Sequence, residues 1–152
     1  MPSTERVFAI IICLWYNICM KHNVWHSRNH KKYLLQYHLI FVTKYRKSIL
    51  DDELSNEIKL LSCEICNKNG VNILYMETDK NHIHYMIDVP TNLSIEKLVK
   101  LLKSYTTYHI WEKYNLSKYY WKERTLWTDG YFICSIGNVS SETLKNYILN
   151  QG

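Results

Sequence analysis

Residues 71–89, VNILYMETDKNHIHYMIDV, decide the fold of this chain. Residues 71–77 and 81–89 are rich in β-branched and aromatic side chains, a composition that predicts two strands. Residues 79–81, Asp-Lys-Asn, have the composition of a tight turn, and Pro90 ends the second strand. The stretch is therefore predicted to form a β-hairpin.

The segments before the hairpin predict one strand and one helix. Residues 35–44, LQYHLIFVTK, have the composition of a strand. Residues 51–68 place apolar side chains at spacings of four, three and four, which is the pattern of an amphipathic helix that ends at Asn69-Gly70. These apolar side chains are Leu54, Ile58, Leu61 and Ile65.

The segments after the hairpin predict a second helix, a last strand and a final helix. Ser94 is the expected cap of the second helix, and a basic loop follows at residues 113–124. Residues 126–136 are predicted to form a strand, and Ser140 is predicted to cap a helix over residues 141–151. The apolar side of the second helix carries Ile95, Leu98, Leu102 and Tyr105, and its other side carries Lys97, Lys100 and Lys103.

The predicted element order is β-α-β-β-α-β-α. This order indicates an α+β fold, in which a ferredoxin-like or RRM-like antiparallel sheet has helices on one face and an added C-terminal helix. The other face of such a sheet is left to hold a site.

Length, charge and composition limit the class of protein. The 152 residues are enough for one domain, and a net charge of +5 suits a polyanionic partner without requiring one. Many of the 13 tyrosines and 5 tryptophans stand beside basic residues, as in residues 44–47 and 118–122. Aromatic faces and cations together are typical of surfaces that hold single-stranded nucleic acid, although core packing is the alternative for any one of them.

The N-terminal residues differ in character from the rest. Residues 7–19, VFAIIICLWYNIC, are apolar but short for a bilayer span, and the preceding Glu5 and Arg6 do not form the basic start of a signal peptide. We expect residues 1–19 to be a non-native or flexible extension and residues 20–152 to be a single domain. A membrane-directed tail is the alternative.

The cysteines indicate a reducing compartment. Five irregularly spaced cysteines imply no disulfide framework, so a cytoplasmic location is expected, with no membrane partner. Cys63 and Cys66 form a lone C-x-x-C without the second pair that a structural zinc site needs. Helix packing is the preferred interpretation of this pair.

Two places carry candidate chemistry. His82 and His84 are two apart on a predicted strand and therefore share a face, where two imidazoles could chelate a divalent metal; two surface histidines are the alternative. Tyr147 and Gln151 are four apart on a predicted helix and also share a face. A metal could activate attack by the tyrosine on a phosphate, and the glutamine oxygen could be a further ligand; simple packing is the alternative for Tyr147.

Together these motifs resemble the TnpA transposases of the insertion-sequence 200/605 family, which are single-tyrosine HUH transposases. The similar segments are residues 34–46 (their N-terminal strand), His82-Ile83-His84 (their histidine–hydrophobic–histidine motif), residues 126–132 and 135–138 (their last strand and turn) and residues 147–151 (their tyrosine helix). The resemblance begins near Tyr33 and does not cover residues 1–19.

The resemblance implies a metal-dependent DNA transposase. It implies that His82, His84 and Gln151 bind Mg²⁺ or Mn²⁺, and that Tyr147 cleaves single-stranded DNA at the element ends to leave a 5′-phosphotyrosine and a 3′-OH. A 3′-OH of another strand then reverses the attack and joins the ends. The implied partners are DNA hairpins and a second subunit, whose tyrosine helix could serve the site in trans about a hinge at Gly137-Asn138.

Charge placement suggests further DNA contacts. The candidate contacts are Lys44, Arg46, Lys47, Lys97, Lys100 and Lys103; a solvated helix face is the alternative for the last three.

Two features depart from the family pattern. Asn81 stands where the family often has aspartate, so Asp79 or Glu77 is expected to orient the metal ligands instead. The chain also ends at Gly152, directly after Gln151.

Three other classes of protein are alternatives. A decayed or domesticated copy would bind hairpin DNA without strand transfer. A replication initiator or relaxase shares the chemistry but is larger and places its tyrosine differently. A plain RNA-recognition module is disfavoured because the aromatic RNP pattern is absent.

Overall fold

The computed structural model describes residues 25–121 and 123–136. The elements in chain order are β1 (His26–Arg28), β2 (Lys31–Tyr33), β3 (Gln36–Val42), η1 (Lys44–Arg46), α2 (Asp52–Lys68), β4 (Asn72–Asp79), β5 (His82–Asp88), α3 (Ile95–Lys113), α4 (Ser117–Tyr120) and β6 (Phe132–Ser135). The predicted N-terminal extension, the turn at Gly137-Asn138 and the helix at residues 141–151 with its cap Ser140 lie outside the described residues.

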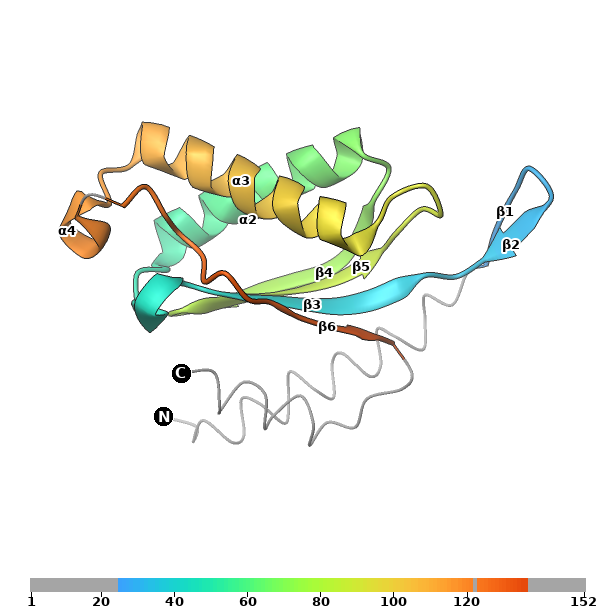
Figure 1. The fold of residues 1–152 in the computed structure, drawn as a ribbon, viewed down its shortest axis with the longest axis horizontal. Helices are drawn as coiled ribbons and strands as arrows, with labels where there is room; N and C mark the ends of the chain where they lie inside the picture. Colours follow the sequence, from blue (N-terminus) through green and yellow to red (C-terminus); the bar gives the residue numbers. More distant parts are fainter. Residues whose placement is uncertain (1–24, 122, 137–152) are drawn as a thin grey trace.

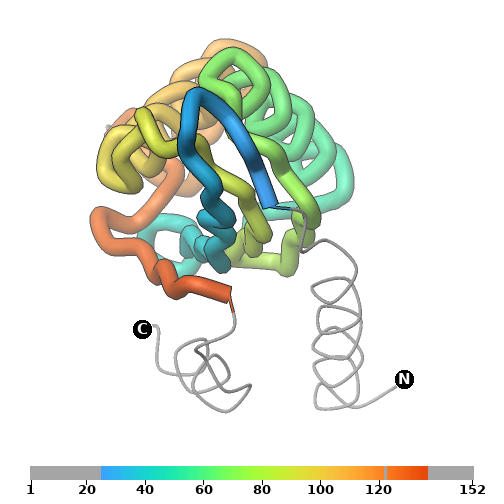
Figure 2. Tube along the Cα trace, turned by 90° about the vertical axis from the view of Figure 1, so that its right-hand side faces the viewer, coloured from blue at the N-terminus to red at the C-terminus, as the bar shows by residue number. Residues whose placement is uncertain are grey.

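Four strands form one antiparallel sheet in the order β4-β5-β3-β6. Helices α2 and α3 lie side by side over one face of this sheet (Figure 1, and in the turned view of Figure 2). The predicted α+β fold, with an antiparallel sheet and helices on one face, is thereby confirmed. The predicted hairpin is also correct, since β4 pairs directly with β5.

The core lies between the sheet and the two helices. Leu39 and Phe41 of β3 and Ile83 and Tyr85 of β5 are fully buried on the helix side. Successive side chains on a strand point to opposite faces, so His82 and His84 project from the second face of the sheet. The alternation of β5 therefore directs Ile83, Tyr85 and Ile87 into the core and both histidines to the opposite side.

Both long helices form where their sequences predict. The apolar side chains expected to pack α2 are buried, and Asp51 caps this helix by accepting a hydrogen bond of 2.8 Å from the Leu54 N–H. Ser94 caps α3 through the Lys97 N–H at 3.3 Å, as predicted. Leu98 and Leu102 of α3 are buried, while Ile95 and Tyr105 pack at the margin of the core.

The last predicted strand is shorter than expected. Only Phe132–Ser135 pair with β3, and Trp127 makes an isolated bridge to Thr43. The carbonyls of residues 128–130 turn away from the sheet because all three accept hydrogen bonds from the Lys103 ammonium. The prediction of a continuous strand over residues 126–136 is thus wrong in its middle.

A second, two-stranded sheet was not predicted. Strands β1 and β2 pair through a two-residue turn at Asn29 and His30, and this ribbon projects from the end of the main sheet (Figure 1). Alternating hydrophobic residues, the usual signal of a strand, are absent from residues 26–33. Among the described residues, no helix has the length and apolar character needed to cross a membrane.

Candidate active site

The H-x-H motif lies at the start of β5, directly after the β4–β5 turn. The ring centroids of His82 and His84 are 4.8 Å apart with their planes at 64°. Val42 and Ile40 of β3 are their cross-strand partners on one side. The predicted placement of both imidazoles on one face is therefore present, on a central strand that neighbours on both sides hold in register.

Asn81 orients the first of these histidines. Its Oδ1 lies 2.8 Å from His82 Nδ1, which donates the hydrogen bond in the tautomer that leaves Nε2 as a lone-pair donor. The Asn81 carbonyl in turn accepts bonds from the Thr43 N–H at 2.9 Å and the Thr43 hydroxyl at 3.1 Å. A carbonyl oxygen behind the ring is the usual partner of a metal-binding histidine.

The expectation that Asp79 or Glu77 would orient the histidines is wrong. The Glu77 carboxylate is used at the edge of the sheet by Lys59 at 3.5 Å and by the hydroxyl of Tyr75 at 3.3 Å. Asp79 Oδ1 accepts the Lys80 N–H at 2.7 Å. The asparagine that stands in place of the family's aspartate itself supplies the oxygen, because an amide carbonyl accepts the same hydrogen bond as a carboxylate.

Burial keeps the histidines of this face neutral. The pKa of His84 is lowered to about 3, mainly by burial and to a smaller extent by the neighbouring His82 and His38. Burial also lowers the pKa of His38 to about 4. The pKa of His82 is lowered mainly by burial, with Asp79 raising it and Arg46 lowering it. Neutral imidazoles at pH 7 are the form that binds a metal.

The η1 turn places one group of the predicted DNA contacts beside this end of β5. Lys44, Arg46 and Lys47 belong to or directly follow η1, which is joined to Asn81 through Thr43. The charge of Arg46 acts on His82, whereas the Lys44 ammonium is paired with Asp129 at 3.1 Å. Of the six predicted contacts, these three share an end of the sheet with the H-x-H motif.

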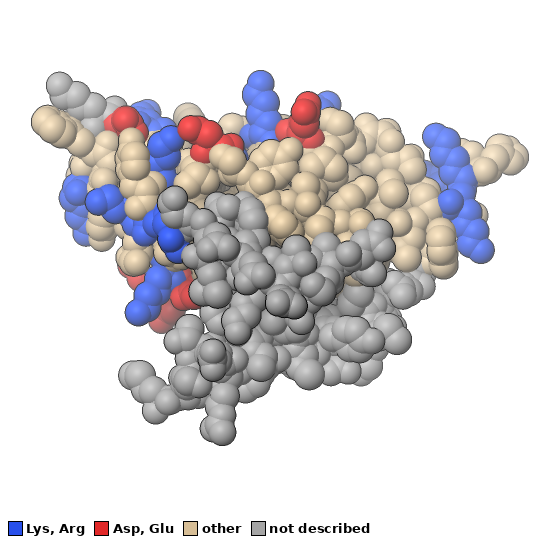
Figure 3. All heavy atoms as spheres, turned by 60° about the horizontal axis from the view of Figure 1, so that its bottom comes forward, with Lys and Arg blue, Asp and Glu red and all other residues tan. Residues whose placement is uncertain are grey.

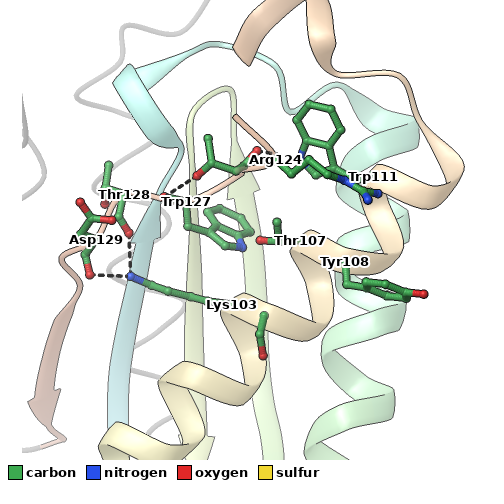
Figure 4. Close-up of a pocket in the computed structure, with 10 residues that line it drawn as sticks. Lys103, Thr107, Tyr108, Trp111, Arg124, Trp127, Thr128 and Asp129 are labelled. Atoms are coloured by element: carbon green, nitrogen blue, oxygen red, sulfur yellow. Dashed lines mark hydrogen bonds between the residues drawn. The ribbon is translucent and has the colours of Figure 1, made fainter. Parts of the chain in front are cut away.

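Lys97, Lys100 and Lys103 lie on the other side of the sheet, on α3. The ammonium of Lys103 donates to the carbonyls of Thr128, Asp129 and Gly130 at 2.7, 3.0 and 2.8 Å, and Figure 4 shows it reaching across to this loop. All three of its donors are thereby used. The structure gives Lys103 a structural role, so of the three predicted contacts on this helix only Lys97 and Lys100 are exposed.

A pocket of about 670 Å³ adjoins Lys103, between α3 and residues 124–129 (Figure 4). Two of its nitrogen-bearing side chains, Trp111 and Arg124, are already paired. Trp111 Nε1 donates to the Thr125 carbonyl at 2.8 Å, and Arg124 lies over the Trp111 ring while binding Glu112 at 2.8 Å. This pocket is separated from the H-x-H motif by the sheet.

The nucleophile and the third ligand predicted from the sequence, Tyr147 and Gln151, lie outside the described residues. Within residues 25–121 and 123–136, no group of three histidine, cysteine, aspartate or glutamate side chains is placed to hold a metal ion. The two imidazoles of His82 and His84 are therefore the described part of the candidate centre.

Comparison with known proteins identifies relatives over most of the chain. Residues 31–151 match the family model described as "Transposase IS200 like". The transposase for insertion sequence element IS200 of Salmonella typhimurium is 25% identical over 125 residues, which are 82% of each chain. The ISDra2 transposase TnpA of Deinococcus radiodurans is 28% identical over 119 residues, or 78% of this chain and 85% of the relative.

Solved structures agree with this relationship. A candidate transposase from Deinococcus radiodurans R1 superposes with a TM-score of 0.75 at 26% identity, over 83% of this chain and 97% of its own. A REP-associated tyrosine transposase, solved bound to a REP hairpin, shares the fold with a TM-score of 0.53 at 10% identity, over 80% and 68% of the two chains.

The sheet order and the strand that carries the H-x-H motif define the class as a tyrosine-transposase fold. The family match covers four fifths of the chain and includes the positions of Tyr147 and Gln151. The chain belongs to the IS200-like transposase family.

Proposed function

We propose that this transposase cuts and rejoins single-stranded DNA at the ends of an insertion sequence, with Tyr147 as nucleophile. The observation that carries the proposal is the pair of neutral imidazoles on β5, one of them oriented by Asn81. Such a pair on a rigid central strand suits metal-assisted phosphoryl chemistry, and the family relationship supplies the substrate class.

His82, His84 and Gln151 would hold Mg²⁺ or Mn²⁺. The burial that keeps both rings neutral and the hydrogen bond that leaves His82 Nε2 available fit this assignment. Bound there, the ion would polarise the scissile phosphate.

Tyr147 carries the covalent step. Its phenolic oxygen forms a bond to phosphorus while the bond from phosphorus to the 3′ oxygen breaks; the phenol loses its proton and the departing 3′ oxygen gains one. The product is a 5′-phosphotyrosine and a free 3′-OH. Rejoining reverses these bonds with the 3′-OH of another strand, so the ester energy is retained and no nucleotide cofactor is consumed.

The proposed partners are DNA hairpins and a second copy of the chain. A structural relative was solved on a REP hairpin, which supports hairpin recognition by this fold. The net charge of +5 and the cations of η1 suit a polyanion. We propose a homodimer in which the Tyr147 helix of one subunit serves the H-x-H site of the other.

A covalent-adduct assay tests this function. The full chain is mixed with labelled single-stranded oligonucleotides from its own element's ends, with Mg²⁺, with Mn²⁺ or with EDTA, and the products are separated on denaturing gels. We expect a shifted, metal-dependent band from the wild type, and none from Tyr147→Phe or His82→Ala.

The matched control is Tyr108→Phe, which removes a hydroxyl from an exposed tyrosine of α3. It should form the adduct at the wild-type level. If the wild type binds the oligonucleotides but forms no adduct under any metal condition, the catalytic proposal fails, and a hairpin-binding protein without strand transfer takes its place.

A further inference from the structure

The β1–β2 ribbon is the most basic part of the described fold that the candidate active site leaves unused. Residues 25–50 contain six lysines and arginines and no aspartate or glutamate. Three of these cations, Arg28, Lys31 and Lys32, are exposed on the ribbon. Figure 3 shows Lys and Arg side chains gathered at its right-hand end, where the ribbon lies in Figure 1.

The ribbon places like charges directly opposite each other. Arg28 pairs with Lys31 in the antiparallel register, and Ser27 pairs with Lys32. Like charges across a strand pair destabilise it, and among the described residues no carboxylate forms an ion pair with Arg28 or Lys31. An anionic ligand would relieve this repulsion. A ribbon with a purely structural role would not need two like charges in opposed positions.

The turn of the ribbon is also strained. Asn29 and His30 both adopt left-handed backbone conformations, with φ of 48° and 63°. Two-residue turns of this kind favour Asn-Gly, because a Cβ at the second position is crowded. His30 therefore holds an imidazole ring at the tip, at a position where glycine would be the stable choice.

The base of the ribbon is fixed to the main sheet. His26 Nε2 lies 2.7 Å from the carboxylate of Asp88 in β5, a residue that is buried and also within 3.4 Å of the Gln36 amide. The His26 ring also lies against Tyr33, with centroids 5.2 Å apart. An isolated two-stranded ribbon is marginal in water, so these contacts hold it in a defined direction.

From these observations we propose that the β1–β2 ribbon binds the double-stranded stem of a DNA hairpin, with Arg28, Lys31 and Lys32 on its phosphates. The inference rests on the proposed function for the identity of the nucleic acid. A two-stranded ribbon fits the major groove, which is about 12 Å wide. The tip residues Asn29 and His30 carry no large aromatic ring, and the exposed Trp25 lies at the base of the ribbon with the Lys32 ammonium 5.9 Å from its ring centroid, so a stem suits the tip better than unpaired bases.

The test compares two double variants that each lower the charge by two. Arg28→Thr/Lys31→Thr removes the opposed pair and keeps β-forming side chains. Lys113→Gln/Lys118→Gln removes two cations at the opposite end of the molecule, at the end of α3 and in α4. The probes are a synthetic DNA hairpin with one helical turn of stem, about 10 base pairs, and an unpaired strand of the same length.

We expect the ribbon variant to bind the hairpin roughly 10- to 100-fold more weakly at 0.1 M salt, with a salt dependence shallower by about two phosphate contacts. Its affinity for the unpaired strand should change several-fold less, and the control variant should bind both probes as the wild type does. Circular dichroism and urea unfolding verify that both variants are folded.

Each other outcome overturns the inference. If the ribbon variant binds the hairpin like the wild type, the ribbon does not contact the stem; if both probes are lost equally, or the control loses as much, the effect is one of net charge. The adduct assay with a saturating concentration of element-end oligonucleotide reports separately on the proposed function, because the covalent reaction should survive in the ribbon variant.

Discussion

Asn81 contributes to the candidate metal site through its side chain and its backbone together. The amide oxygen accepts from His82 Nδ1, while the backbone carbonyl binds Thr43 and joins the β4–β5 turn to η1. The two contacts are separable, because a substitution at this position removes the side-chain bond to His82 and keeps the backbone bonds to Thr43.

Replacing Asn81 should weaken metal binding without unfolding the turn. Loss of the oxygen behind a metal-bound histidine typically lowers metal affinity by about 10- to 100-fold. Asn81→Ala should show that loss for Mn²⁺ in isothermal titration calorimetry, and Asn81→Asp should retain the affinity because it keeps an acceptor. Equal affinities for Asn81→Ala and the wild type would mean that another group orients His82.

Lys103 is expected to act in stability rather than in DNA binding. Lys103→Met should lower the free energy of unfolding by about 1–3 kcal/mol, since three carbonyls lose a charged donor. Lys100→Met, an exposed position on the same helix, is the control and should change stability by less than about 0.5 kcal/mol. Urea unfolding measures both.

The opposite pattern would restore the DNA-contact hypothesis for Lys103. That pattern is unchanged stability in Lys103→Met together with a loss of affinity for single-stranded DNA. The same comparison tests whether the loop at residues 128–130 depends on this ammonium for its departure from the sheet.

At the scale of elements, a buried hydrogen bond joins α2 to β5. The Ser62 hydroxyl donates to the Ile58 carbonyl at 2.7 Å and lies 2.9 Å from the Tyr85 hydroxyl, and both residues are fully buried. A serine hydroxyl has one hydrogen, so Tyr85 must be the donor to Ser62. Tyr85 immediately follows His84, and this bond therefore fixes the helix over the strand of the H-x-H motif.

The two ends of this bond should respond unequally to substitution. Ser62→Ala strands the Tyr85 donor in the core and should lower the free energy of unfolding by about 1–3 kcal/mol. Tyr85→Phe removes the donor and leaves Ser62 bound to Ile58, so it should cost less. Urea unfolding of both variants and the double variant gives the order, and a larger loss for Tyr85→Phe would show that the donor was assigned wrongly.

Elements with a strong local pattern could be predicted from the sequence, and those fixed by distant contacts could not. The spacing of Leu54 and Ile58 in α2 and the alternation in β5 encode their elements directly. The ribbon and the break in the last strand depend on contacts far along the chain: His26 with Asp88, and Lys103 with residues 128–130. No local window contains both partners of either contact.

The same division holds within the candidate site. The placement of His82 and His84 on one face follows from the two-residue period of a strand and was predicted. The role of Asn81 was missed because its value as an acceptor depends on a side-chain rotamer, which the sequence does not encode. The sequence did contain one indication of this role, because Asn81 directly precedes His82.

At the scale of the whole molecule, subunit mixing tests the proposed trans arrangement. Neither His82→Ala nor Tyr147→Phe should form adducts alone. In a mixture, half of the dimers combine the two variants, and each such dimer has one complete site if the tyrosine helix acts in trans. We therefore expect adduct formation to recover to about a quarter of the wild-type level.

A silent mixture would argue for sites built within one subunit, provided that exchange of subunits is confirmed with differently tagged chains. The control is a mixture of His82→Ala with His84→Ala, which lacks an intact H-x-H pair in every dimer. It should remain inactive under either arrangement.

Strand β3 separates the two proposed DNA contacts by a fixed length. Its first residue, Gln36, adjoins the ribbon's anchor at Asp88, and its last, Val42, pairs with His82. Seven strand residues span about 20 Å, and successive nucleotides of a stacked strand rise about 3.4 Å. The nucleotide that reaches the H-x-H motif would thus lie about six steps from the stem, and the position of the cut would be counted by protein geometry rather than by reading bases.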